Sequence, residues 1–271
     1  MQSKIKIIII IITLLFNSKV ISQSTEKVVD TFLKVTKIDS ELSQIDQVID
    51  SKLQQKKAEI ESLDSYNKFS RVVKNNFNSE KSIEFLKTFL IKKTEDKDLK
   101  DIIELYDNPL LIKMSGYESS FNDPKNKEAQ LAFFKNLKTN PPKQERVNLL
   151  IKLNETLNST VRTKDLLEKI IMAFSKGYNL TLPKEKQLGT NELNTKIKSE
   201  LPANISQQIT NQSIAVGLYV YKSVNDDELK KYIKIWKTDI GKRYIDLTFK
   251  AYEAVFEKMS IDLINNLNNT F

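Results

Sequence analysis

Helical spacing of the apolar residues runs through nearly the whole chain and constrains its fold more than any other feature. Apolar side chains recur three or four positions apart, and no segment shows the strict alternation of a β-strand. Only five glycines and six prolines interrupt the 271 residues, and they stand where helices should begin or end. The pattern predicts an all-α protein, folded as a multi-helix bundle.

The last predicted helix has the most regular apolar stripe of the chain. Its members follow one another at steps of three or four positions: Ile245, Phe249, Tyr252, Phe256, Met259, Leu263 and Leu267. Such a near-heptad seam packs lengthwise against another helix. We expect the preceding helix of the same chain to be that neighbour, and a dimeric coiled coil is the alternative.

The first 24 residues have the features of a secretory signal. Two lysines precede an apolar run that ends at Phe16, and small residues at the cleavage spacing follow from Val20 onwards. A membrane-spanning helix needs about 20 apolar residues, so this run is too short to favour an anchor. We expect a signal peptide at residues 1–24, cleaved between Val20 and Thr25. The mature protein is then exported, periplasmic or secreted, without a stable membrane span.

The longest interruption of the mature chain is the run Thr139-Asn140-Pro141-Pro142. Because proline cannot continue a helix, we expect a boundary here between a first helical module at residues 25–140 and a second at 143–271. In the second module we expect a helix closed by Gly177, a polar loop over residues 178–190, and a long helix from Leu201 to about Ser223.

Two segments 130 positions apart share a pattern that indicates an internal duplication. Residues 98–106 align with residues 228–236, and each segment ends in a large aromatic ring, Tyr106 or Trp236. Two positions later, each copy has a capping residue followed by a favourable first helical residue. We therefore expect two related helical halves with equivalent helix–corner–helix units, the second at residues 226–268, and both rings buried.

Histidine and cysteine are absent from the sequence, which excludes several classes of site. The chain has no imidazole base, no thiolate nucleophile, no disulfide and no cysteine–histidine zinc site. It also lacks the clustered glycines of a phosphate loop or dinucleotide fingerprint. The run Asn225-Asp226-Asp227-Glu228 lacks the spacing of an EF-hand and indicates a helix start instead. We expect no cofactor and no metal.

The basic charge of the chain does not indicate a nucleic-acid partner. The formal net charge is +8, but only four of the 43 basic residues are arginine, and the lysines are spread among acids. Recognition of phosphates and bases favours the bidentate guanidinium group. We therefore expect a mixed-charge, solvated surface.

Residues 227–243 resemble a bacterial family, the domain-of-unknown-function family numbered 2059. The pattern of that family has an acidic helix start, a leucine, an aromatic residue, then Ser-Pro-x-Gly and a basic pair. Here Trp236 takes the aromatic position, Thr238 the serine and Gly241 the glycine, whereas Asp239 stands in place of the proline. The resemblance therefore assigns Gly241 a structural role at a corner.

Longer exported members of that family are similar over roughly residues 26–271. They carry a Leu/Tyr-Glu element after the first corner, matched here by Tyr117-Glu118, and an arginine near the start of the next helix, matched by Arg146. The resemblance implies an exported, all-helical protein. It brings no activity, ligand or catalytic residue with it.

Glu118 and Arg146 are the charged residues that the sequence singles out. On a helix beginning at Pro109, Glu118 shares a face with Leu111 and Met114, where an unpaired charge is costly. Arg146 is one of few arginines, which suggests a need for a planar guanidinium rather than a lysine. We expect the two to form a bidentate pair; the alternative is that both are ordinary surface charges.

The sequence favours a non-enzymatic binding or envelope-associated protein, whose partner is an envelope protein, a peptide or a lipid. The alternative is a carboxylate-dependent hydrolase that acts on envelope polymers. Paired acids about 5 to 9.5 Å apart across a cleft would favour the hydrolase. A deep apolar groove between helices would favour the binding protein. Aromatic residues that could line such a groove are Tyr106, Tyr219, Tyr221 and Trp236.

Overall fold

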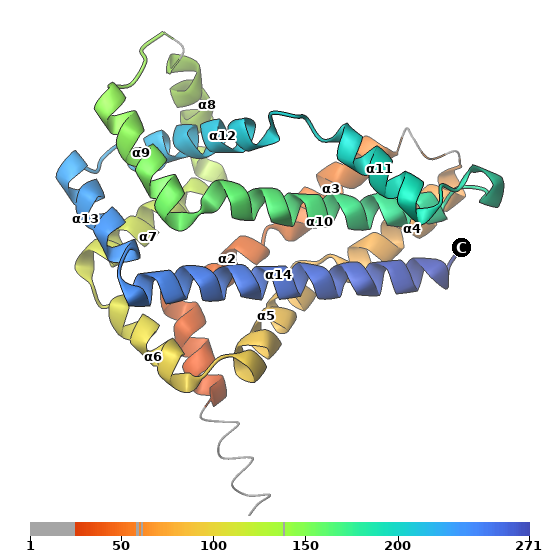
Figure 1. Cartoon of the computed structure of the whole chain (residues 1–271), viewed down its shortest axis with the longest axis horizontal. Helices are drawn as coiled ribbons and strands as arrows, with labels where there is room; N and C mark the ends of the chain where they lie inside the picture. Colours follow the sequence, from red (N-terminus) through yellow and green to blue (C-terminus); the bar gives the residue numbers. More distant parts are fainter. Residues whose placement is uncertain (1–24, 58–59, 61, 138) are drawn as a thin grey trace, which may run out of the picture.

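The protein is described by a computed structural model that defines residues 25–57, 60, 62–137 and 139–271. The predicted signal peptide at residues 1–24 lies outside these residues. All regular structure in the defined ranges is helical, with no strand among them (Figure 1). The prediction of an all-α multi-helix bundle is confirmed.

Residues 25–36 form the first helix. The helices from there to the proline run are α2 (Ile38–Leu42), α3 (Ile45–Lys56), α4 (Leu63–Asn76), α5 (Ser79–Lys93), α6 (Asp96–Leu105), α7 (Pro109–Phe121), the short 3-10 helix η1 (Pro124–Asn126) and α8 (Lys127–Asn136). The helices after it are α9 (Gln144–Leu157), α10 (Ser159–Leu180), η2 (Lys184–Lys186), α11 (Thr190–Glu200), α12 (Ile205–Val220), α13 (Asp226–Trp236) and α14 (Asp239–Asn268).

Several helices begin at the capping residues expected from the sequence. The side chain of Asn108 accepts a hydrogen bond from the backbone N–H of Leu110 at 2.9 Å, with Pro109 as the first helical residue. Asn225 and Glu228 form a reciprocal capping box at the start of α13. Because these caps satisfy N–H groups that have no partner inside the helix, they fix where each helix begins.

The C-terminal helix α14 lies along the middle of the bundle (Figure 1). Of its predicted stripe, Ile245, Met259, Leu263 and Leu267 are buried within the chain. Phe249, Tyr252 and Phe256 are only partly buried. The predicted neighbour is wrong, because α14 packs chiefly along α10 and α5, with a smaller contact to α13. The reason is length: α13 has 11 residues, whereas α14 has 30 and α10 has 22, so only a long helix can follow the stripe.

Gly177 does not close a helix as expected, since α10 continues through it to Leu180. A Cβ atom at Gly177 would stand 2.6 Å from Cδ1 of Leu267 and 3.5 Å from Cε2 of Phe69. The glycine therefore allows the end of α14 to lie close against α10, rather than providing a turn.

Two further boundaries differ from the prediction. The helix expected from Leu201 begins only at Ile205 and ends at Val220, because Pro202 disfavours helical geometry at the residue before it. The polar loop expected over residues 178–190 is shorter, and Thr190–Glu200 forms a helix, α11, that the sequence analysis did not identify.

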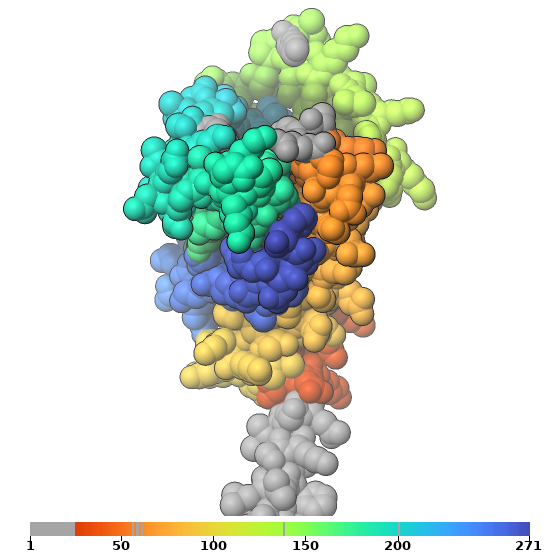
Figure 2. All heavy atoms as spheres, turned by 90° about the vertical axis from the view of Figure 1, so that its right-hand side faces the viewer, coloured from red at the N-terminus to blue at the C-terminus, as the bar shows by residue number. Residues whose placement is uncertain are grey.

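A single apolar core joins helices from both sides of the proline run. It includes Phe32 and Phe69 from before the run and Leu229 and Met259 from after it. In Figure 2 the blue end of α14 lies between the teal helix α11 and the orange and yellow helices α3 to α5. The division into modules at residues 25–140 and 143–271 stays a prediction, but the two share this core.

Candidate functional site

Glu118 lies half-buried on α7 and accepts two hydrogen bonds from tyrosine hydroxyl groups. The Oη atoms of Tyr221 and Tyr232 lie 2.5 Å and 2.6 Å from Oε1 of Glu118. Hydrogen bonds to a carboxylate are stronger than bonds between neutral groups. The carboxylate therefore links α7 to α13 and to the residue that follows α12.

Arg146 on α9 does not contact Glu118, its expected partner, but binds two other groups. Its Nη1 donates to Oδ1 of Asp226 at 2.7 Å, and its Nη2 donates to the backbone carbonyl of Tyr221 at 2.6 Å. The predicted bidentate pair of Arg146 with Glu118 is wrong, because Tyr221 intervenes. Its carbonyl accepts from Arg146 while its hydroxyl donates to Glu118, so the two charged groups belong to one network without direct contact.

We expect replacement of Glu118 by leucine to lower the free energy of unfolding by about 1–3 kcal/mol for each tyrosine hydroxyl that loses its acceptor. Glu118→Gln is the matched control, because its amide oxygen can still accept, and its cost should be about 1 kcal/mol or less. Urea unfolding of both variants measures the difference. In a Tyr221→Phe, Tyr232→Phe background the cost of Glu118→Leu should shrink; equal costs for leucine and glutamine would contradict the network.

The rings of Tyr106 and Trp236 meet the same third ring, that of Tyr244. The centroids of Tyr106 and Tyr244 lie 5.7 Å apart, and Trp236 stacks on Tyr244 at 5.3 Å. Tyr232 and Trp236 meet in an edge-on contact, with their ring centroids 5.5 Å apart. Tyr106 and Trp236 are 7% and 3% exposed, so the prediction that both rings are buried is confirmed.

Burial raises the pKa of the hydroxyl groups in this cluster. Tyr106, Tyr221 and Tyr232 all lie where a phenolate would be poorly solvated, and their pKa values are above that of a free phenol. The negative charge of Glu118 raises the pKa of Tyr221 and Tyr232 further. All three hydroxyl groups therefore stay protonated, and those of Tyr221 and Tyr232 act as donors to Glu118.

Gly241 lies in the first turn of α14, directly after the corner that follows Trp236. The side chain of Thr238 accepts a hydrogen bond from its N–H at 3.1 Å. A Cβ atom at Gly241 would lie 2.5 Å from the carbonyl oxygen of Ile235 and 2.8 Å from Cα of Trp236. Because these are backbone atoms, no side-chain rotation can make room, and the structural role assigned to Gly241 has a direct steric cause.

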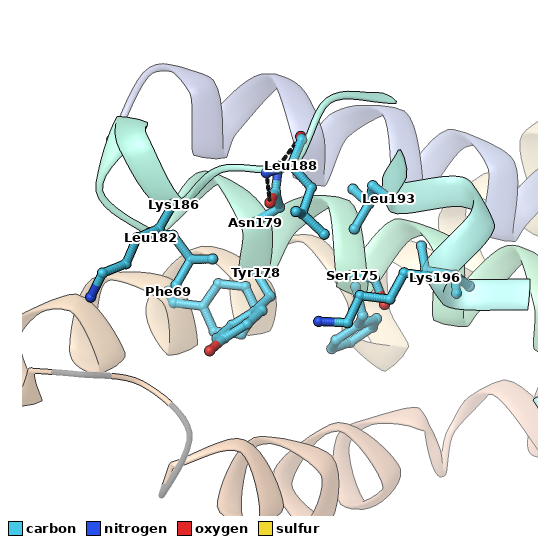
Figure 3. A pocket seen from close by; sticks show the side chains of 11 residues that line it. Phe69, Ser175, Tyr178, Asn179, Leu182, Lys186, Leu188, Leu193 and Lys196 are labelled. Atoms are coloured by element: carbon cyan, nitrogen blue, oxygen red, sulfur yellow. Dashed lines mark hydrogen bonds between the residues drawn. The ribbon is translucent and has the colours of Figure 1, made fainter. Parts of the chain in front are cut away.

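A pocket of about 210 Å³ lies at the other end of the bundle, between α4, α10, α11 and the loop of residues 181–189 (Figure 3). We call it the α11 pocket. Its walls are mostly apolar and include Phe69, Phe174, Leu182, Leu188, Leu193 and Ile197. The sequence did not predict this pocket, because no helix was expected over residues 191–200, which form part of its wall. Leu193 and Ile197 lie four positions apart on one face of α11, and this apolar spacing is typical of a helix.

Asn179 holds the loop that closes the α11 pocket. Its Nδ2 donates to the carbonyl of Leu188 at 3.0 Å, and its Oδ1 accepts from the N–H of Leu188 at 2.9 Å (Figure 3). Asn179 is buried, and both bonds satisfy its amide. The wall is therefore fixed by the protein itself, as is usual for pockets that are formed before a ligand binds.

Lys196 supplies a positive charge at the α11 pocket. Its side chain reaches from α11 across the pocket towards Tyr178 (Figure 3). Among the acids that the structure describes, none forms an ion pair with Lys196. The pocket therefore combines apolar walls with an ammonium group that is available to a ligand.

No protein-family model matches the sequence, and comparisons with curated proteins and with solved structures give no match. Over the described ranges, no group of three or more acids is arranged to hold a metal ion. None of the helices in those ranges is long and apolar enough to cross a membrane.

Proposed function

We propose that the protein is an exported, non-enzymatic binding protein whose α11 pocket takes the apolar part of a small amphipathic anion. The observation that carries this proposal is the combination of apolar walls with the unpaired ammonium group of Lys196. A carboxylate attached to an alkyl chain has both features that such a site recognises. The ligand class that we propose is thus a lipid-derived acid. A lipid is one of the partner classes expected from the sequence.

The size of the α11 pocket restricts the ligand. A cavity of about 150 Å³ holds one benzene ring, whereas sites for drug-sized molecules occupy about 300–1,000 Å³. The α11 pocket, at about 210 Å³, lies between these. A medium-length alkyl chain fits such a space, and each buried methylene contributes about 0.8 kcal/mol to binding.

Export and internal duplication are further parts of the proposal. Export is supported by the charge and apolar pattern of residues 1–24. Duplication is supported by the two corners, since Asn108 and Thr238 each cap a second helix directly after a buried aromatic residue. The resemblance to the family numbered 2059 rests on the residues around Trp236 and Gly241.

Calorimetric titration of the mature protein with hexanoate, octanoate, decanoate and dodecanoate tests the proposed function. We expect the affinity to rise about fourfold per added methylene until the pocket is full, which is the factor that corresponds to about 0.8 kcal/mol. Lys196→Met should weaken binding about tenfold, because it removes the charge and keeps the length of the side chain. Native mass spectrometry of protein from its own host then identifies the natural ligand.

Lys198→Met is the matched control for this titration, because Lys198 is exposed on the same helix and does not line the pocket. It should bind the acids as the unchanged protein does. Equal weakening by Lys196→Met and Lys198→Met, or an affinity that does not depend on chain length, would contradict the proposal.

The hydrolase alternative gains no support from Glu118. Its Oε1 accepts hydrogen bonds from two tyrosines, so neutral donors hold this half-buried carboxylate, and no second acid among the described residues lines the pocket beside it.

A further inference from the structure

A second pocket, of about 240 Å³, lies beside Glu118 and is separate from the α11 pocket. We call it the Glu118 pocket. Helices α7, α9 and α12 form its walls, and most of the wall is apolar: Phe121, Leu150, Leu153, Leu157, Val216 and Val220. The pocket exists partly because residue 217 is glycine. A Cβ atom there would meet Cδ2 of Leu150 at 2.9 Å.

Among the residues that the structure describes, Glu118 and the hydroxyl group of Tyr221 are the only ionisable groups on the wall of this pocket. Both tyrosine hydrogen bonds go to its Oε1. No bond to its Oε2 is found within the described part of the chain, and no lysine or arginine there forms an ion pair with it. A carboxylate in mostly apolar surroundings with only neutral donors lacks a counter-charge, which is unfavourable.

The nearby cation, Arg146, does not supply that counter-charge. Its guanidinium group is already paired with Asp226 and bonded to the carbonyl of Tyr221. The tyrosine hydroxyls hold the Glu118 carboxylate in one orientation and keep one oxygen for a further donor. A ligand that brings a positive charge and an apolar body would complete the site.

We propose that the Glu118 pocket binds a small organic ammonium ion, with the ammonium group at Oε2 of Glu118 and an apolar body against α9 and α12. The volume suits one aromatic ring with a short chain, since about 150 Å³ holds a benzene ring alone. This site is independent of the α11 pocket and selects the opposite charge.

Calorimetric titration of the mature protein with phenylethylammonium tests this proposal. Phenylethanol is the matched ligand, because it has the same ring and chain without the charge. We expect phenylethylammonium to bind at about millimolar concentration and phenylethanol to bind at least about tenfold more weakly, because a hydrogen bond to a charged group is lost. Equal binding of the two ligands, or no binding of the ammonium ion, would overturn the proposal.

Three variants locate the binding site. Glu118→Gln keeps the oxygen that accepts from the tyrosines but removes the charge, and it should reduce the affinity for phenylethylammonium by about tenfold or more. Ser213→Leu enlarges a side chain on the pocket wall and should also weaken binding, whereas Gln212→Leu, at an exposed position of the same helix, should not. Unchanged affinity in both Glu118→Gln and Ser213→Leu would show that the ion binds elsewhere, which also overturns the proposal.

Discussion

Replacing Gly241 with alanine should lower the free energy of unfolding by about 3 kcal/mol or more. The added methyl group would lie 2.5 Å from the carbonyl oxygen of Ile235 and within 3.0 Å of two backbone atoms of Trp236. Overpacking a core costs about 1–3 kcal/mol even where side chains can move, and here the corner itself would have to open. Opening it would separate Trp236 from Tyr244, on which it stacks.

Gly116→Ala is the matched control for this substitution. Gly116 lies inside α7, and an added Cβ atom there would meet nothing within 4 Å. Alanine favours a helix over glycine by about 0.5–1 kcal/mol, so the control should stabilise the protein. Urea unfolding of both variants should give opposite signs, and a loss of less than about 1 kcal/mol at Gly241 would contradict the steric explanation.

Stability should fall steeply as the pH rises above about 10. Tyr106, Tyr221 and Tyr232 have pKa values in the folded state that are raised above those in the unfolded chain, chiefly by burial. Above the unfolded pKa of about 10, the unfolded chain releases these protons while the folded protein keeps them. Each tyrosine then lowers the free energy of unfolding by about 1.4 kcal/mol per pH unit, so these three contribute about 4 kcal/mol per pH unit. Burial also raises the pKa values of Tyr244 and Tyr252, which add to this slope.

Absorbance of tyrosinate and helical circular dichroism, followed over the same pH range, measure this effect. The ionisation of the three tyrosines should coincide with loss of helix, because they ionise only when the core opens. Tyr232→Phe should reduce the pH slope by about one proton, and the comparison cancels the contribution of the lysines, which both proteins share. Ionisation of all tyrosines before any loss of helix would show that the cluster is open to solvent.

The all-helical secondary structure and the first residues of several helices could be predicted, because both have local causes. The cap at Asn108 and the capping box at Asn225 depend on residues within three positions, so the sequence specifies them directly. Burial of Tyr106 and Trp236 followed from their size and position before a cap. The helix start expected at Leu201 is wrong, because Pro202 disfavours helical geometry at the residue before it.

The partners of Glu118 and Arg146 could not be predicted because they depend on contacts far apart in sequence. An unpaired acid on an apolar face requires a donor, but the sequence does not say whether the donor is a guanidinium or a hydroxyl group. The structure provides Tyr221 and Tyr232, more than 100 positions away. The α11 pocket was missed for a related reason, since its walls come from α4, α10 and α11 and none of them alone indicates a cavity.

The central position of α14 also affects when the protein can fold. This helix follows every other described helix in the chain, yet α4, α5, α6 and α10 all pack against it. Until residues 239–268 have been synthesised, α4, α5, α6 and α10 lack this common partner, although some of the earlier helices already pack on one another. Contacts between residues far apart in sequence form late and slowly. The bundle therefore closes only after α14, the last of the described helices, has been synthesised.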